Sequence, residues 1–150
     1  MPTASTVPAF IDALLAAMTT ALPGVQVSAA WPGPDVTDEE TLFIGAEVEN
    51  WDLEIPTMKA GRKQRQETYT VSLEAWVAKP GLLRAESASA ARTRAVEIID
   101  AVDSFLADDP ALTPSVLWAR LEGRGATLVP FDKGWSCQAT ASISVAARLT

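Results

Sequence analysis

The clearest pattern in the sequence lies in residues 67–78, which read ETYTVSLEAWVA. Apolar side chains alternate with polar ones through this stretch, and a strand turns successive side chains to opposite faces of its sheet. The apolar side consists of Tyr69, Val71, Leu73, Ala75 and Val77. The other side consists of Thr68, Thr70, Ser72, Glu74 and Trp76. We therefore predict a strand with one buried face and one face in water.

Similar alternation occurs on both sides of this strand. A short strand is expected at 25–30, a second strand at 42–48 and a long final strand at 137–145. A fourth strand is expected within 116–129, where the glycines near 123–125 favour a hairpin turn. Residues 50–66 lose the alternation, so we expect a long hairpin-like connection there.

Two segments have the spacing of amphipathic helices. The first is expected at about 6–22, followed by Pro23 and Gly24, which stop it. The second follows the turn at 79–81 and ends near Asp108. Its buried stripe is predicted to contain Ala88, Ala91, Ala95, Ile98, Val102 and Phe105. The small residues in its first half predict close approach to the sheet.

The element order is therefore helix, three strands, helix, two strands (α-β-β-β-α-β-β). The chain has 150 residues and no internal repeat or long linker, so residues 1–150 are expected to form a single domain. Strands with one apolar face predict an antiparallel or mixed sheet with both helices packed on that face. The expected fold class is α+β.

Composition removes several functional classes. Lys and Arg number 12 against 19 Asp and Glu, and the net charge of -7 argues against a chain that coats nucleic acid or anionic lipid. With 0 His and 1 Cys, namely Cys137, the chain offers no Ser-His-Asp or Cys-His triad, no HExxH motif and no Cys/His zinc site. No enzymatic activity and no cofactor are expected, although chemistry that needs only carboxylates stays open.

Neither a signal peptide nor a membrane span is expected. No Lys or Arg precedes the first apolar stretch, and Asp12 interrupts it. No window approaches 18 consecutive apolar residues. Trp76 and Trp118 fall on expected strands, and we favour a core position over an interface position for each.

Two charged clusters are the candidate interaction residues. The basic cluster concentrates 4 of the chain's 12 cations within seven residues and suits phosphate groups or the acidic face of a neighbouring subunit; the alternative is a solvated hairpin tip. The acidic cluster could hold a divalent cation, but its spacing fits no EF-hand, so a solvated loop is favoured. We also hypothesise that it pairs with the basic cluster of another copy. The basic cluster is Lys59, Arg62, Lys63 and Arg65, and the acidic cluster is Asp38, Glu39 and Glu40, with Asp35 nearby.

The order of these elements and their residue patterns resemble those of the tail terminator, or tail completion, proteins of long-tailed bacteriophages. The resemblance covers nearly the whole chain and rests on no invariant motif. It is carried by the helix beginning VPAFIDALLAAM, a short strand ending in AAWPGP, the strand TLFIGAEVE, a long charged connection, the strand ETYTVSLEAWVA, the helix RAESASAARTRAVEIIDAVDSFLAD and the final stretch GWSCQATASISVAARLT.

The resemblance implies a non-enzymatic virion protein with an α+β fold. Such proteins form a hexameric ring on the head-proximal end of the tail tube, stop its polymerisation and provide the head-docking surface. The implied partners are further copies of the chain, the tail tube protein and the head-tail connector protein, with DNA passing through the lumen and no membrane contact. Assembly would occur in the host cytoplasm. The connection that carries Lys59, Arg62, Lys63 and Arg65 resembles the extended hairpin loop that such proteins direct toward neighbours or the lumen.

Two alternatives remain open. A head-to-tail connector, or neck protein, shares the size, the acidity and the small α+β architecture. A small cytoplasmic ligand-binding domain would instead use a pocket between the sheet and the helices.

Overall fold

The strands form a single mixed sheet. The computed structural model describes residues 5–29, 40–57, 64–80, 84–109, 112–131 and 134–149. Its elements are α1 (Val7–Ala21), β1 (Gln26–Ser28), β2 (Glu40–Thr57), β3 (Gln64–Pro80), α2 (Arg84–Asp108), β4 (Val116–Phe131) and β5 (Gly134–Leu149). The sheet order is β1-β2-β3-β5-β4, with β1 parallel to β2 and all other pairs antiparallel. The predicted α+β class and element order are confirmed.

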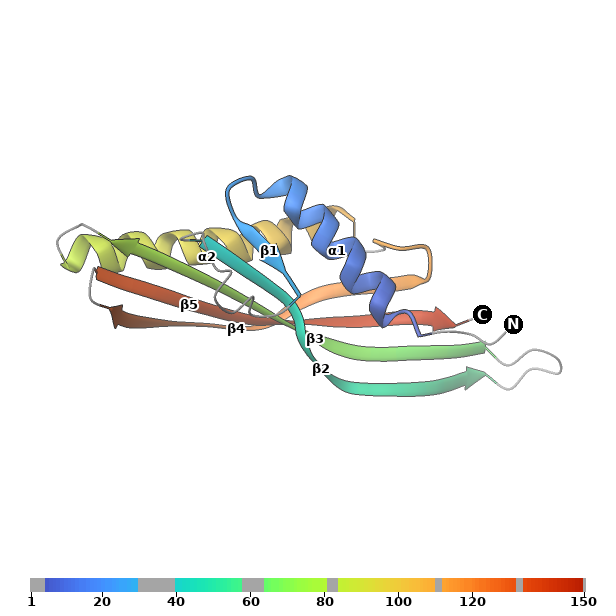
Figure 1. Cartoon of the computed structure of the whole chain (residues 1–150). Coiled ribbons are helices and arrows are strands. Elements are labelled where there is room, and N and C mark those ends of the chain that lie inside the picture. The colour runs from blue at the N-terminus through green and yellow to red at the C-terminus, as the bar shows by residue number, and fades with distance from the viewer. Residues whose placement is uncertain are drawn as a thin grey trace.

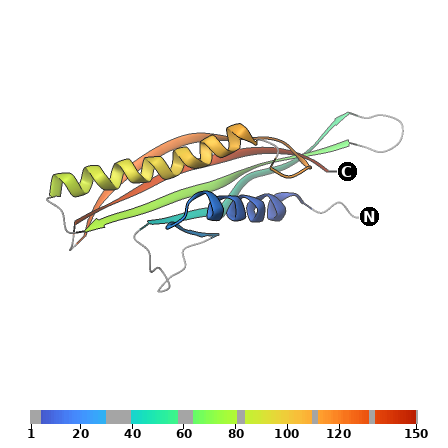
Figure 2. The same ribbon diagram turned by 90° about the horizontal axis from the view of Figure 1, so that it is seen from above.

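Both helices lie on the same face of the sheet (Figures 1 and 2). The helix α1 packs on β1 and β2, whereas α2 packs on β5, β3 and β4. The core lies between this face and the helices. Its largest buried side chains include Tyr69, Phe10, Leu14, Met18, Leu42, Ile44, Leu73, Ile98 and Ile143.

The predicted faces of β3 and β5 are confirmed. All five apolar residues predicted for one face of β3 are buried, and so are Cys137, Ala139, Ala141, Ile143 and Val145 of β5. The stripe of α2 is slightly rotated from the prediction, because Ala88 and Phe105 are only half-buried while Ile99 and Leu106 are buried. The opposite face of the sheet is mainly polar, with buried Phe43 as an exception.

Residues 50–66 are not one long connection, as the sequence predicted. Strand β2 continues to Thr57, and β3 already begins at Gln64. The pairing of β2 with β3 has register shifts between Ile44 and Val48, between Glu49 and Asp52, and between Glu54 and Thr57. Bulges of this kind add unpaired residues without ending a strand, and they break the two-residue period in the sequence.

The turn predicted at 123–125 is also wrong. Strand β4 runs through this stretch, with a register shift between Glu122 and Gly125 on its pairing with β5. Gly123 has a φ of 59°, a left-handed conformation that glycine adopts without steric cost. The two glycines therefore form a bulge within one strand rather than a hairpin turn.

The start of α2 is fastened to the sheet at Gly134. The Ser87 hydroxyl donates to the Lys79 carbonyl and accepts from the Trp135 backbone N–H at 3.0 Å. A Cβ atom at Gly134 would lie 2.6 Å from the Lys79 carbonyl oxygen and 2.8 Å from Ser87 Oγ. Only glycine therefore allows β3, β5 and α2 to approach each other this closely.

Gly134→Ala is expected to lower the free energy of unfolding by about 1–3 kcal/mol, because the nearest atom belongs to backbone that is paired in the sheet. The matched control is Gly125→Ala, where the nearest atom to the new Cβ is Thr140 Oγ1 at 3.4 Å. That change should stay within about 0.5 kcal/mol. Urea unfolding measures both, and equal losses would contradict the close-approach argument.

Candidate functional site

A buried carboxylate lies where α1 meets the outer part of the β2–β3 hairpin. Glu67 of β3 is only 3% exposed. Its Oε1 accepts hydrogen bonds from the Thr6 backbone N–H at 2.9 Å and from Thr6 Oγ1 at 2.7 Å. Its Oε2 accepts a hydrogen bond from the Trp51 indole N–H at 2.7 Å. One side chain thus joins the N-terminus of α1 to both strands of the hairpin.

These hydrogen bonds keep Glu67 ionised. Burial raises the pKa of the carboxyl, but the hydrogen bonds from Thr6 and Trp51 together outweigh it, so the net shift is downward. Tyr69 lies beside this group, with its hydroxyl 3.2 Å from Thr6 Oγ1. Burial, together with the charge of Glu67, raises the pKa of Tyr69 to about 12. At neutral pH the cluster therefore holds one negative charge and a neutral phenol.

The indole ring that Glu67 holds is open to solvent. Trp51 is 56% exposed, although its N–H is fixed. Leu53 and Ile55 are exposed as well and follow at two-residue spacing. Leu53 is paired with Glu67, so this stripe lies on the same side of the sheet as the helices. Figure 2 shows the outer part of the hairpin extending beyond the N-terminal end of α1.

Both edges of the sheet are open in the part of the chain that the structure describes. The pairing of β1 with β2 ends at Phe43, and no described strand lies outside the rest of β2. On the other side β4 is the edge strand, and its exposed apolar residues are Leu117, Trp118, Val129 and Phe131. The exposed edge of a sheet is a template for pairing with another chain.

The first half of β4 also carries an exposed guanidinium. Arg120 stacks over the Trp118 ring, 4.9 Å from its centre, and its Nε donates to Glu122 at 2.8 Å. Trp118 is 39% exposed, so its predicted core position is wrong. The cause is its place on the uncovered face of an edge strand. Trp76 is half-buried, and its indole N–H donates to Glu74.

The predicted charged clusters are only partly described. Lys59, Arg62, Lys63, Asp35, Asp38 and Glu39 lie outside the described residues. Arg65 is exposed near the start of β3. Glu40 begins β2 and binds Arg94 Nε of α2 at 2.6 Å, with Lys79 Nζ at 3.8 Å. The hydrogen bond to Glu40 is the main reason why the pKa of Arg94 is raised.

Glu40 and Arg65 are far apart within one copy. Glu40 is paired with Val77, which lies 12 residues further along β3 than Arg65. At about 3.3 Å per residue, roughly 40 Å separates them. Contact between these two residues would therefore need a second copy, and Glu40 already has partners in its own chain.

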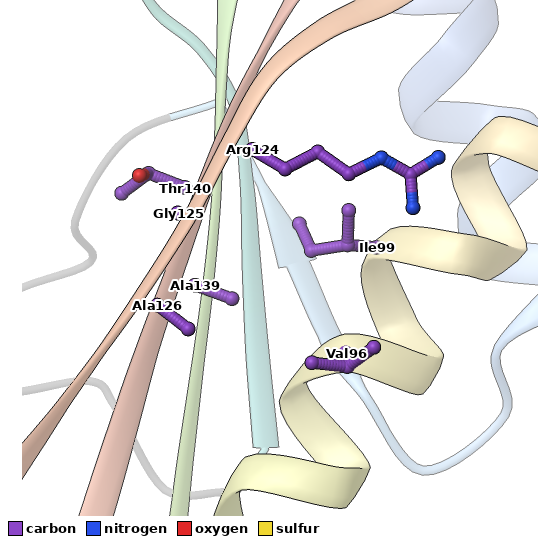
Figure 3. A pocket seen from close by; sticks show the side chains of 7 residues that line it. All are labelled: Val96, Ile99, Arg124, Gly125, Ala126, Ala139 and Thr140. Atoms are coloured by element: carbon purple, nitrogen blue, oxygen red, sulfur yellow. The ribbon is translucent and has the colours of Figure 1, made fainter.

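A cavity of about 240 Å³ lies between α2 and the β4–β5 edge (Figure 3). Its only charged lining residue is Arg124, which extends toward α2 and binds Asp100 Oδ1 at 2.6 Å and also Asp103. These hydrogen bonds raise the pKa of Arg124. The remaining lining residues are Val96, Ile99, Gly125, Ala126, Ala139 and Thr140. The cavity thus offers apolar contact but no convergent group for catalysis.

Other chemistry is sparse in the described residues. They contain no group of three or more His, Cys, Asp or Glu residues placed to hold a metal ion. Burial raises the pKa of the Cys137 thiol, which lowers its reactivity. None of the described helices has the length and apolarity needed to cross a membrane.

In comparisons with known proteins, no family model and no curated protein matches the chain.

Sequence reasoning missed the stripe at Trp51, Leu53 and Ile55, because residues 50–66 were interpreted as a connection. A signal for it exists, since these residues alternate with Asp52 and Glu54. The bulges between 44 and 52 shift this short alternation out of phase with the preceding one. The burial of Glu67 has no sequence signal, because its donors come from segments that are remote in the sequence.

Glu67→Gln is expected to lower the free energy of unfolding at pH 7 by about 1.5–3 kcal/mol, since charged acceptors make the stronger hydrogen bonds. The folded pKa of Glu67 lies below 4.5, so its contribution is present above about pH 4.5. It is lost as the pH falls through the folded pKa.

The difference between wild type and Glu67→Gln should therefore shrink at low pH. Urea unfolding at pH 7 and at pH 3 measures it, with exposed Asp12→Asn as the control that should change stability by less than about 0.5 kcal/mol. A difference that is constant with pH would refute the role given to the charge.

Proposed function

We propose that the chain is a structural assembly protein of a phage tail. Copies of it form a ring on the head-proximal end of the tail tube, stop the tube from growing and offer a surface to the head. The observation that carries this proposal is that no described strand covers β4 or most of β2, the edge strands on opposite sides of one sheet, and that each has exposed apolar side chains. The resemblance of the sequence to tail terminator proteins supplies the biological setting.

Opposite edges suit a ring for a simple reason. When one patch of a subunit binds a different patch of the next, the contact can be repeated, and it closes into a ring if the rotation allows. A ring that matches the tube on one side and lacks the tube's surface on the other would end polymerisation. The described residues bear no catalytic constellation that points elsewhere.

The cavity beneath α2 is the feature that the alternative of a ligand-binding domain would use. Its volume of about 240 Å³ is below the usual range for a ligand site, and its one charged group is already paired with two carboxylates. We therefore place assembly first. The neck protein alternative shares the assembly role and differs in the step that fails when the protein is missing.

Inactivation of the gene in its phage should give full heads and overlong tails, because only loss of a stop lets the tube add further rings. Electron microscopy of the lysate measures tail length. Tails of normal length that fail to join heads would indicate a neck protein. Normal virions would overturn the proposal and favour the ligand-binding alternative.

A further inference from the structure

The two open edges carry complementary residues at the same level along the strands. Glu49 of β2 is paired with Thr70 of β3, Thr70 is paired with Ser144 of β5, and Ser144 is paired with Arg120 of β4. Glu49 and Arg120 therefore lie at the same level on the two edges of the sheet. Closer to the outer end of the hairpin, Asp52 of β2 and Trp118 of β4 lie at the same level, because the pairing links them through Thr68 and Ala146. Both levels lie toward the end of the sheet that carries the outer hairpin.

The directions of the two edge strands also match. Adjacent strands from β2 through β3 and β5 to β4 are all antiparallel, so β2 and β4 run in opposite directions. A second copy placed beside the first with the same orientation would therefore set its β4 antiparallel to β2. Antiparallel neighbours are the commoner arrangement in sheets.

Charge favours this pairing over a two-fold pairing of β2 with itself. Residues 47–55 of β2 contain four acids and no base, namely Glu47, Glu49, Asp52 and Glu54. A β2–β2 contact would bring like charges together, which is destabilising across strands. On β4, Arg120 uses Nε for Glu122, and a guanidinium has further N–H donors for a second carboxylate.

Trp51 is suited to anchor such a contact. Its indole N–H is fixed by buried Glu67, so the exposed ring loses little conformational freedom when it is covered. Tryptophan is enriched among the residues that dominate binding energy at interfaces. Leu53 extends the same apolar stripe, and Leu117 is an exposed apolar residue close to that level on β4, whereas Trp118 lies on the uncovered face.

We propose that residues 47–55 of β2 in one copy pack against residues 117–122 of β4 in the next copy, antiparallel and without displacement along the strands. The inference rests on the proposed function and names the contact that builds the ring. Glu49 then faces Arg120 on the uncovered face of the sheet, and the Trp51 stripe, which lies on the helix side, packs beside Leu117. The bulges in both edges limit the backbone ladder to short stretches, so backbone hydrogen bonds and side chains both contribute to the contact.

The absence of displacement has two consequences. A contact without displacement along the strands can close into a ring, provided that the rotation between neighbouring copies divides a full turn. In addition, Glu40 of one copy stays about 40 Å from Arg65 of its neighbour, as it does within one copy. The contact between copies therefore does not use Glu40 as a mate for Arg65.

Cysteine cross-linking tests the contact. Leu53→Cys and Leu117→Cys are combined in one chain; the native Cys137 is buried and can stay. Oxidation at high protein concentration should give a ladder of covalent oligomers that ends at one largest species. Each single variant should stay monomeric on a non-reducing gel.

Two results would overturn the inference. One is the absence of a ladder from the double variant, and the other is efficient dimer formation by Leu53→Cys alone, which indicates a two-fold β2 contact. If mass measurements still detect a ring without cross-links, the proposed function stands and only this contact is wrong. The proposed function itself fails if gene inactivation leaves virions normal, whatever the cross-links show.

A charge exchange gives an independent readout. Glu49→Arg in the cross-linking background should lower the yield of oligomers by about tenfold, because it places two cations in contact. Adding Arg120→Glu should restore most of the yield. Glu86→Arg, on the exposed first turn of α2 at the other end of the sheet, is the control and should leave the yield unchanged. Failure of the double exchange to restore cross-linking would contradict the proposed register.

Discussion

The pairing of β3 with β5 is the constraint on which the rest of the structure depends. It runs from Arg65 opposite Leu149 to Pro80 opposite Gly134 without a register shift. The helix α2 packs on the face that these strands supply, α1 packs beside it on β1 and β2, and both irregular strands, β2 and β4, attach to this regular pair. Because the central register is unbroken, it fixes which residue of one open edge is level with which residue of the other.

The outer hairpin is held in place by a polar group instead of by the main core. Glu67 sits in the β3 strand, at a position where the alternation would place an apolar residue, and three hydrogen bonds from Thr6 and Trp51 compensate for its burial. The same carboxylate ties the start of α1 to the strands. The apolar stripe beyond it thus stays exposed on a fixed frame, which is what a surface for assembly requires.

Much of the fold could be predicted from the sequence, because β3, β5 and both helices follow a single period over many residues. The errors fall where bulges break that period, at residues 50–66 and at the glycines 123 and 125. A bulge and a turn have similar composition, and only the pairing with the neighbouring strand distinguishes them. The prediction of an α+β fold was correct despite these errors, because it depends on the order of the elements and not on the length of each strand.

The candidate site was harder to predict. Local charge density points to clusters such as Lys59, Arg62 and Lys63, which lie outside the described residues. The burial of Glu67 and the level match of Glu49 with Arg120 depend on contacts between remote segments, and no local pattern encodes them. Residues 51–55 did carry a readable alternation, but its phase differs from that of the strand before it.

Hydrogen exchange at low and high protein concentration tests the central claim most directly. The account predicts that backbone amides in residues 47–55 and 117–122 gain protection together as copies assemble, while the β3–β5 pair is protected at both concentrations. Protection gained at β2 alone would indicate a two-fold contact. No gain at either edge would contradict the claim that these edges bind each other.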